Sequence, residues 1–300
     1  MAVRLLAAVA AILVALFAQL PAAAAERLVT DLLGRQLLVP EDPRRIVALA
    51  PSLSEIVFAL GAEARLAGVV QFADFPPAAR ALPVVGSYVR PDLERIVGLA
   101  PDLVLAIRDG NPKEVVERLG GLGIPVFAMD PRDLAGVLAT IAAVGSLVGE
   151  EQRAAALVAD LHRRLAAVEI RIPAAANRPR VLFQIGEAPL IAAGPETFLD
   201  EAIRRAGGVN ALAAGIYPKL DMERVLALAP EVIVVTSMTG DKSAAQLLAP
   251  WRDWPGVPAV AADRLYVVEA SLFDRPSPRL VDGIEVLSRL LHPQAWGAEP

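Results

Sequence analysis

The stretch YVRPDLERIVGLAPDLVLA at residues 88–106 decides the fold, because the chain carries a second copy of it, YPKLDMERVLALAPEVIVV, at residues 217–235. Each copy predicts a loop with an aromatic residue, a short helix opened by Asp, a stop at Pro and a buried strand. Two copies this far apart predict two similar lobes, since the spacing is too long for a solenoid repeat. The identical pairs, at a constant offset of 129 residues, are Tyr88/Tyr217, Asp92/Asp221, Glu94/Glu223, Arg95/Arg224, Leu99/Leu228, Ala100/Ala229 and Pro101/Pro230.

The composition is that of a globular protein with ample core material. The chain has 300 residues, of which 55% are hydrophobic and 21% charged, so it is long enough for one large domain or two ordinary ones. The formal net charge is −5, or −6 once Arg4 is removed with the leader, and no long Lys/Arg cluster occurs. We therefore expect no nucleic-acid partner. The absence of cysteine excludes a disulfide framework, a thiolate metal site and a lipid-anchored N-terminal Cys.

Residues 1–25 are predicted to be a signal peptide. Arg4 precedes an apolar run of 16 residues, Leu5–Leu20, and Ala23-Ala24-Ala25 supplies a cleavage site before Glu26. The alternative is an uncleaved anchor, but the run is short for a membrane span and no later stretch is apolar enough to be one. The sequence thus predicts an exported, soluble, unlipidated protein of a bacterial periplasm.

Strands and helices are predicted to alternate along both halves. Residues 28–39 resemble a hairpin with its turn at Gly34-Arg35, and short apolar strands then alternate with amphipathic helices. Ser52 and Glu55 have capping-box spacing at the start of the first helix. The predicted fold class is α/β, with two Rossmann-like lobes built on parallel central sheets, at residues 26–148 and 174–300.

One long helix is predicted to connect the lobes. Residues 149–173 contain no Gly or Pro between their first and last positions and keep an apolar stripe, so they predict a helix roughly 36 Å long. Because such a helix resists bending, we expect little movement between the lobes. The cleft between them is the expected binding site.

Several motifs carry a family resemblance over residues 28–292. They are RIVALAPSLSEIVFALGAEARLAGVV at 45–70, FADFPPAA at 72–79, VGSY at 85–88, AIRDGN at 106–111, LGIPVF at 122–127 and FDRPSPR at 273–279. This pattern resembles the helical-backbone class of periplasmic binding proteins, which serve ABC importers of vitamin B12, haem and ferric siderophores. Within the class, the chain is most similar to the cobalamin-binding members.

The resemblance implies that a corrinoid, as transported ligand and not as a cofactor, lies between the lobes. Aromatic residues suit a large flat ring, because each buries roughly 150–250 Å². Isoleucine stands at three positions where the family often has an aromatic residue, and supplies apolar area without a π-face. Asp274 and Arg275 either hydrogen-bond ligand amides or pair with each other. For each aromatic residue, the alternative to ligand binding is a place in the hydrophobic core. The implied ligand-binding positions are Phe72, Tyr88, Ile107, Ile185, Ile191, Tyr217, Ser271, Leu272, Phe273, Asp274 and Arg275.

The resemblance also implies that Glu94 and Glu223 dock onto arginines of an ABC permease dimer in the inner membrane. Two carboxylates on matching lobes provide a symmetric pair of anchors, which set orientation and association rate. The alternative is that each glutamate only complements its helix dipole, worth about 0.3–1 kcal/mol. We expect the receptor itself to be a monomer.

Other functions are less well supported by the sequence. The two histidines, His162 and His292, lie in no nucleophile-elbow or metal pattern, and no glycine-rich phosphate loop is present. We therefore expect no catalytic residue and no resident metal, and place a secreted hydrolase last. Tyr88 or Tyr217 could ligate iron, so a haem-binding protein is the second reading, followed by a ferric-siderophore receptor.

Overall fold

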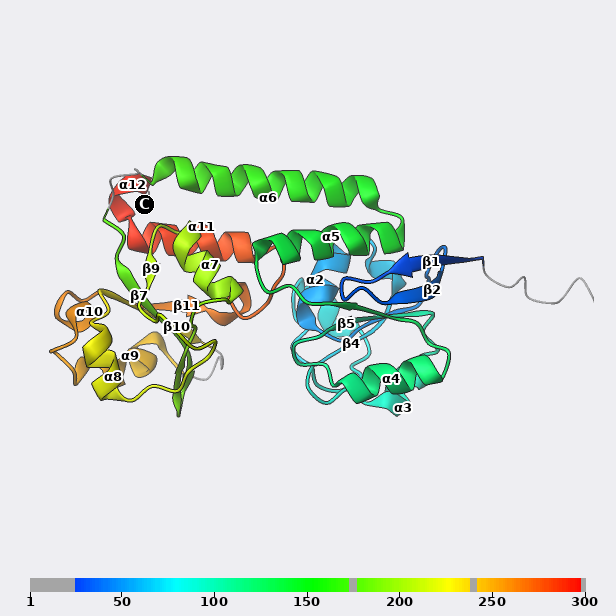
Figure 1. Ribbon diagram of the computed structural model, residues 1–300, viewed down its shortest axis with the longest axis horizontal. Helices are drawn as coiled ribbons and strands as arrows, with labels where there is room; N and C mark the ends of the chain where they lie inside the picture. Colours follow the sequence, from blue (N-terminus) through cyan, green and yellow to red (C-terminus); the bar gives the residue numbers. More distant parts are fainter. Residues whose placement is uncertain (1–24, 173–176, 238–241, 298–300) are drawn as a thin grey trace, which may run out of the picture.

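The computed structural model describes residues 25–172, 177–237 and 242–297. Two lobes lie side by side and are connected along one edge by a long helix (Figure 1). The predicted signal peptide, apart from its last residue, falls outside the described residues. Among the described helices, none combines the length and hydropathy needed to cross a membrane.

The first lobe is built on a four-stranded parallel sheet. Its strands are β3 (Ile46–Ala48), β4 (Leu66–Val69), β5 (Leu103–Ile107) and β6 (Val126–Met129), in the order β4-β3-β5-β6. An antiparallel hairpin precedes them, formed by β1 (Glu26–Thr30) and β2 (Gln36–Pro40). Gly34 takes φ +80° in its turn, a backbone conformation that favours glycine, so the predicted hairpin is confirmed.

The second lobe repeats this strand order with one antiparallel addition. Its strands are β7 (Arg180–Glu187), β8 (Leu190–Ala192), β9 (Val209–Asn210), β10 (Val232–Ser237) and β11 (Leu265–Glu269). The sheet runs β11-β10-β7-β8, β9 pairs with the start of β7, and only β8 is antiparallel. The strand that ends each repeat copy, β5 or β10, therefore occupies the same place in its sheet. The predicted α/β fold with two lobes is confirmed, while the division at residues 148 and 174 stays a prediction.

Helices flank both sheets. The connector is α6 (Glu151–Arg171), which packs against α5, α7 and α11, and Arg164 on α6 donates to Glu285 on α11 at 2.9 Å. At 21 residues it is about 32 Å long. The other helices are α2 (Pro51–Ala59), α3 (Leu93–Gly98), α4 (Lys113–Gly121), α5 (Leu134–Val148), α7 (Phe198–Arg205), α8 (Met222–Leu228), α9 (Ala244–Arg252), α10 (Pro258–Ala261), α11 (Leu280–Leu291) and α12 (Pro293–Trp296).

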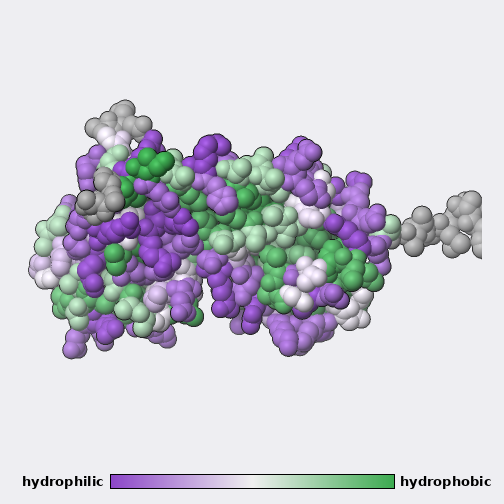
Figure 2. All heavy atoms as spheres, turned by 45° about the horizontal axis from the view of Figure 1, so that its top comes forward, coloured by the Kyte–Doolittle hydropathy of each residue, from purple (hydrophilic) through white to green (hydrophobic). Residues whose placement is uncertain are grey.

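One hydrophobic core continues from lobe to lobe. A single buried cluster includes Leu103 of the first sheet, Ile141 and Leu161 of α5 and α6, and Val232 of the second sheet. Figure 2 shows apolar residues across the middle of the face where the lobes meet. Two smaller clusters cover the opposite faces of the two sheets. The lobes are thus joined by packing as well as by the connector.

The capping-box interpretation of Ser52 and Glu55 is wrong. Helix α2 begins at Pro51, its N-cap is Ala50, and no side chain caps it. A proline at the first helical position has a preset φ and no N–H to satisfy, so the helix starts without a cap. Both Ser52 and Glu55 are buried, which leaves Glu55 available for another partner.

Candidate ligand-binding site

Two adjoining hollows lie where the lobes face each other. The first, which we call the tyrosine compartment, has a volume of about 640 Å³ and is lined by Tyr88 and Tyr217. The second, the phenylalanine compartment, has a volume of about 710 Å³ and is lined by Phe72 and Phe75. Tyr88, Ile107, Asp274 and Pro276 line both, so the two compartments form one cleft with walls from both lobes.

The ring of Tyr88 is held in place by the turn that follows β5. Asn111 is buried, and its side-chain amide donates to the carbonyl oxygens of Tyr88 at 2.8 Å and Leu49 at 2.9 Å. Its Oδ1 accepts from the backbone N–H of Ile107 at 2.7 Å. A Cβ at Gly110 would lie 2.1 Å from the Tyr88 ring, so only glycine allows this approach. The AIRDGN turn therefore positions Tyr88 in the cleft.

Tyr217 is positioned by a different device. Its loop is hydrogen-bonded to the segment after β7, with Gly194 N donating to Ile216 O at 2.8 Å and Leu220 N donating to Leu190 O at 2.9 Å. A Cβ at Gly194 would lie 1.7 Å from the carbonyl oxygen of Gly215, so the two backbones need glycine to approach this closely. Tyr217 remains 40% exposed, which leaves it available to a ligand.

The two tyrosines face a shared electrostatic environment. Burial raises the pKa of Tyr88 well above its ordinary value, and nearby Asp109 and Tyr217 add to the effect. Burial also raises the pKa of Tyr217 to about 12, with a further contribution from Asp109. Both phenols are therefore neutral at physiological pH and serve as flat apolar faces with a polar tip.

Of the three isoleucines predicted to bind ligand, two line the cleft and one does not. Ile107 is the last residue of β5 and Ile185 lies near the end of β7, and both line the tyrosine compartment. Ligands of α/β folds bind at the carboxyl ends of parallel strands, which is where these residues lie. Ile191 is on β8, is bridged to Lys219 and is absent from the lining of either compartment.

The phenylalanine compartment contains one expected aromatic residue and one that was missed. Phe72 is 76% exposed and adopts φ +64°, a conformation uncommon for a bulky residue. Phe75, three residues later in the same motif, is 40% exposed, and the Arg279 guanidinium stacks on its ring 3.9 Å from the centroid. The sequence could have identified Phe75 as a candidate, since the FADFPP motif contains both Phe72 and Phe75.

The assignment of Phe273 to the ligand site is wrong. Its side chain is fully buried and packs against Phe183 of β7, with the ring centroids 5.1 Å apart. Leu272 packs against the same core. The short 3₁₀ turn at Ala270–Leu272 directs these two residues inward and leaves Ser271 and Asp274 in the lining of the cleft.

Arg275 links the two lobes, although it also lines the phenylalanine compartment. Its Nη1 donates to Glu55 Oε1 at 2.8 Å and to Asp74 Oδ1 at 2.9 Å, and the Ser277 hydroxyl donates to Glu55 Oε2 at 2.7 Å. The side chains of Arg275 and Glu55 are only 12% and 2% exposed. Burial raises the pKa of Glu55, and the hydrogen bonds from Arg275 and Ser277 oppose that rise. We call Glu55, Asp74, Arg275 and Ser277 the interlobe latch. Of the two alternatives for Asp274 and Arg275, the pairing with each other is not observed as a hydrogen bond or ion pair, since Arg275 pairs with Glu55 and Asp74.

Asp274 is the polar group shared by both compartments, and its titration gives a prediction. Desolvation in the cleft raises its pKa from 3.8 to about 7, against the opposing charge of Arg275. The folded protein therefore holds this proton more tightly than the unfolded chain, so stability is lost as pH rises from about 4 to about 7. We expect Asp274→Asn to stabilise the protein more at pH 8 than at pH 5 in urea unfolding. Asp253→Asn, at the surface, is the control, and an equal gain at both pH values would contradict the prediction.

Glu94 and Glu223 lie outside the cleft, in the first turns of α3 and α8. Both are exposed, and neither forms a hydrogen bond or ion pair with any described residue. Figure 1 shows α3 and α8 at the lower edge of their lobes, on the side away from α6. The two carboxylates are thus free to meet a partner.

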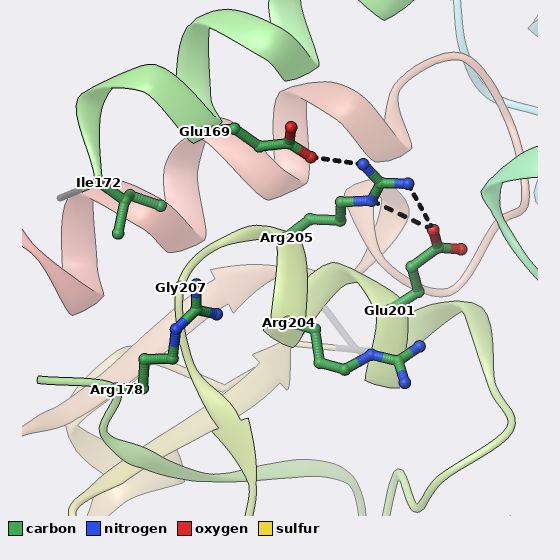
Figure 3. A pocket seen from close by; sticks show the side chains of 7 residues that line it. All are labelled: Glu169, Ile172, Arg178, Glu201, Arg204, Arg205 and Gly207. Atoms are coloured by element: carbon green, nitrogen blue, oxygen red, sulfur yellow. Dashed lines mark hydrogen bonds and ion pairs between the residues drawn. The ribbon is translucent and has the colours of Figure 1, made fainter. Parts of the chain in front are cut away.

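A further hollow of about 500 Å³ lies away from the cleft, between the end of α6 and α7 (Figure 3). Arg205 spans it, pairing with Glu169 of α6 and with Glu201 of α7 at 3.2 Å. Glu201 also accepts from the backbone N–H of Leu134 at 2.7 Å, at the start of α5. The pairs satisfy the carboxylates and fasten the second lobe to α5 and α6.

The fold and the cleft define a class of protein. A model of the periplasmic binding protein family matches residues 46–272, and the chain belongs to this family. This confirms the resemblance seen in the motifs. Within the described residues, no group of three or more His, Cys, Asp or Glu side chains is arranged to hold a metal ion.

Relatives of two binding specificities are similar to the chain. The cobalamin-binding protein of Halobacterium salinarum is 32% identical over 274 residues, covering 87% of this chain and 73% of that protein. The structure of the periplasmic vitamin B12-binding protein of Vibrio cholerae superposes with a TM-score of 0.76 at 28% identity, covering 86% of this chain and 100% of that one. A periplasmic heme-binding protein of Pseudomonas aeruginosa gives a TM-score of 0.78 at 32% identity, covering 86% and 95%.

Proposed function

We propose that this chain is a periplasmic receptor that binds a corrinoid of the vitamin B12 type between its lobes and delivers it to an ABC permease. The observation that carries the proposal is the pair of tyrosines, one from each repeat copy, that line one compartment of the cleft. The similarity to cobalamin-binding and vitamin B12-binding proteins supports the choice of ligand.

The cleft has the chemistry that a large, flat, partly apolar ligand requires. Tyr88, Tyr217 and Phe72 offer ring faces, and Ile107 and Ile185 add apolar area. Each compartment alone has the 300–1,000 Å³ of an ordinary small-molecule pocket, about 640 and 710 Å³ here, so the joined cleft suits a larger ligand. Asp109 and Asp274 supply acceptors for amide or hydroxyl groups.

Haem is the second candidate, since a heme-binding structure is among those similar to this chain. A tyrosine that ligates ferric iron does so as the phenolate. The raised pKa of Tyr88 and of Tyr217 (the latter to about 12) opposes loss of that proton. Neutral phenols suit stacking and hydrogen bonding against a corrinoid, and the similarity to cobalamin-binding and vitamin B12-binding proteins supports the first candidate.

Titration with the two ligands separates them. We expect cyanocobalamin to give a one-to-one calorimetric isotherm with the mature protein, and hemin to leave its Soret band unchanged. A shifted Soret band with no heat from cyanocobalamin would establish the haem reading instead. The proposal extends to export through the signal peptide, an unlipidated monomeric state and the absence of enzymatic turnover, which generic ester and glycoside substrates would check.

Glu94 and Glu223 are proposed to dock onto the permease, one on each lobe. We expect Glu94→Ala combined with Glu223→Ala to leave cyanocobalamin affinity unchanged and to weaken association with the permease about tenfold or more, because paired charges orient a complex. The matched control is Glu63→Ala combined with Glu151→Ala, which removes two exposed carboxylates elsewhere. Loss of ligand affinity in the first double variant would contradict the docking role.

A further inference from the structure

The helices α3 and α8 present the same surface, position by position. Residues 94–100 and residues 223–229 show the same order of exposed, intermediate and buried positions. One residue is buried in each helix, Ile96 or Val225, and faces the sheet. On the outer side Val97 and Leu226, at equivalent positions, are each 40% exposed. The similarity between the two helices therefore extends to their outer faces, where packing in the core imposes no constraint.

The glutamate and the aliphatic residue of each helix form one patch. Glu94 and Val97, like Glu223 and Leu226, are three positions apart, a spacing that places side chains next to each other on a helix. An exposed apolar residue beside an unpaired carboxylate gives a surface patch that offers both hydrophobic contact and negative charge. Both features occur twice on the molecule, at corresponding positions of the two lobes.

The N-terminus of each helix is fixed in the same way. Asp92 accepts from the backbone N–H of Arg95 at 3.1 Å, and Asp221 accepts from that of Arg224 at 2.8 Å. Such caps stabilise a helix by about 1 kcal/mol. Each helix is short, so the cap restricts a large part of it.

The C-terminus of each helix is held by an arginine from the start of the neighbouring strand. Arg45 donates to Leu99 O at 3.0 and 2.6 Å, and Arg180 donates to Leu228 O at 3.2 and 2.8 Å. Cations at this end complement the helix dipole and satisfy carbonyl groups that lack a partner in the helix. Arg45 and Arg180 are therefore equivalent, although they lie outside the repeat.

A third matched feature fixes each arginine in turn. Asp102 accepts from the backbone N–H of Arg45 at 2.9 Å, and Glu231 accepts from that of Arg180 at 2.8 Å. Between helix and strand, Ala100 and Ala229 take φ +45° and +44°, which is a strained conformation for alanine. The same strain in both lobes shows that one backbone geometry is maintained twice.

We propose that each lobe carries one composite docking face, Glu94 with Val97 and Glu223 with Leu226, and that Arg45 and Arg180 hold these faces in position. The partner that fits is a homodimer whose subunits each present a cation beside an apolar surface, because two equal faces match a twofold-symmetric partner. Rigid faces bind with less entropy loss, which gives the arginines their role as positioning residues. The inference rests on the proposed delivery to an ABC permease and adds its apolar and positioning parts.

The apolar part is tested with Val97→Ser and Leu226→Ser. Binding of each variant to the cobalamin importer of the source organism, held in lipid nanodiscs, is measured by surface plasmon resonance. We expect each to weaken the complex about fivefold to tenfold, and by similar factors, as for a moderate interface residue. Val286→Ser, which removes an aliphatic residue 37% exposed on α11, is the control and should have no effect. Unchanged binding of either variant, or an effect in one lobe only, would overturn the proposal that the two lobes carry equivalent docking faces.

The positioning part is tested with Arg45→Ala in double-mutant cycles. A residue that positions the first face should couple with Val97→Ser in the same lobe and be additive with Leu226→Ser in the other. Hydrogen exchange of the α3 amides should become faster in Arg45→Ala, with α8 unchanged. Equal coupling to both lobes would show a general loss of structure and overturn the positioning role.

Cyanocobalamin titration of every variant separates this inference from the proposed function. All variants should keep the wild-type ligand affinity. If the wild-type protein itself failed to bind cyanocobalamin or the importer, the proposed function would be wrong. If the wild type bound both and the serine variants associated normally, only the composite docking face would be wrong.

Discussion

Replacing Glu55 with alanine is expected to lower the free energy of unfolding by about 3–5 kcal/mol, as for the removal of one partner of a buried ion pair. The substitution leaves the guanidinium of Arg275 without the acceptor at 2.8 Å and the hydroxyl of Ser277 without the one at 2.7 Å. Both side chains are largely buried, so their polar atoms would be poorly solvated after the substitution. Urea unfolding followed by circular dichroism measures the change.

Asp74→Ala is the matched control for Glu55→Ala. Asp74 also accepts from Arg275, at 2.9 Å, but its side chain is 44% exposed, so its loss should cost no more than about 1 kcal/mol. Glu55→Gln, which keeps the shape and an acceptor oxygen, should fall between the two. Equal and small effects of all three substitutions would show that the interlobe latch contributes nothing.

Replacing either tyrosine of the cleft with alanine is expected to weaken cyanocobalamin binding by about 30-fold, as for an aromatic residue that anchors an interface at a cost of about 2 kcal/mol. Tyr88 and Tyr217 stand on opposite lobes, so loss of either removes one face of the site. Calorimetric titration measures the affinity, and the free energy of unfolding reports any damage to the fold.

Two substitutions control the tyrosine prediction. Tyr88→Phe keeps the ring and should change the affinity by less than about fivefold, since stacking area dominates. Phe273→Leu should lower stability without changing affinity, because that side chain packs against Phe183 in the core. A large affinity loss in Phe273→Leu would restore the residue to the ligand site and contradict its buried role.

The connections between the lobes make large rigid-body closure unfavourable. The connector α6, the continuous core and the interlobe latch all join them, and the latch lies at the cleft itself. The expectation of small movement was based on α6 alone, so the structure adds two independent reasons for it. Superposing structures with and without ligand would test this, and a hinge rotation of one lobe would refute it.

The repeat explains why so much of the architecture could be predicted. Local rules place a helix after Asp92 or Asp221 and a buried strand after Pro101 or Pro230, and the duplication extends these rules to two lobes. The cleft tyrosines were implied by the family resemblance, and the repeat places them at equivalent positions of the two lobes. Hydrophobic periodicity and the residues that begin or end a helix or strand are properties of neighbouring positions, so a single sequence displays them directly.

Features that depend on distant partners could not be predicted. Glu55 and Arg275 are 220 residues apart, and only folding reveals that they meet. Arg45 and Arg180 were missed because they lie at a different offset from the one that defines the repeat. The orientation of Phe273 was misjudged because a 3₁₀ turn, which has no strong local signal, decides which of its neighbours faces the cleft.

A crystal structure of the protein with cyanocobalamin would test the central claim most directly, namely that the duplicated segment supplies both walls of a corrinoid site. We predict that the corrin ring lies between Tyr88 and Tyr217, with Asp274 within hydrogen-bonding distance of a ligand amide. Ligand bound away from both tyrosines, or an empty cleft at saturating concentration, would contradict the account.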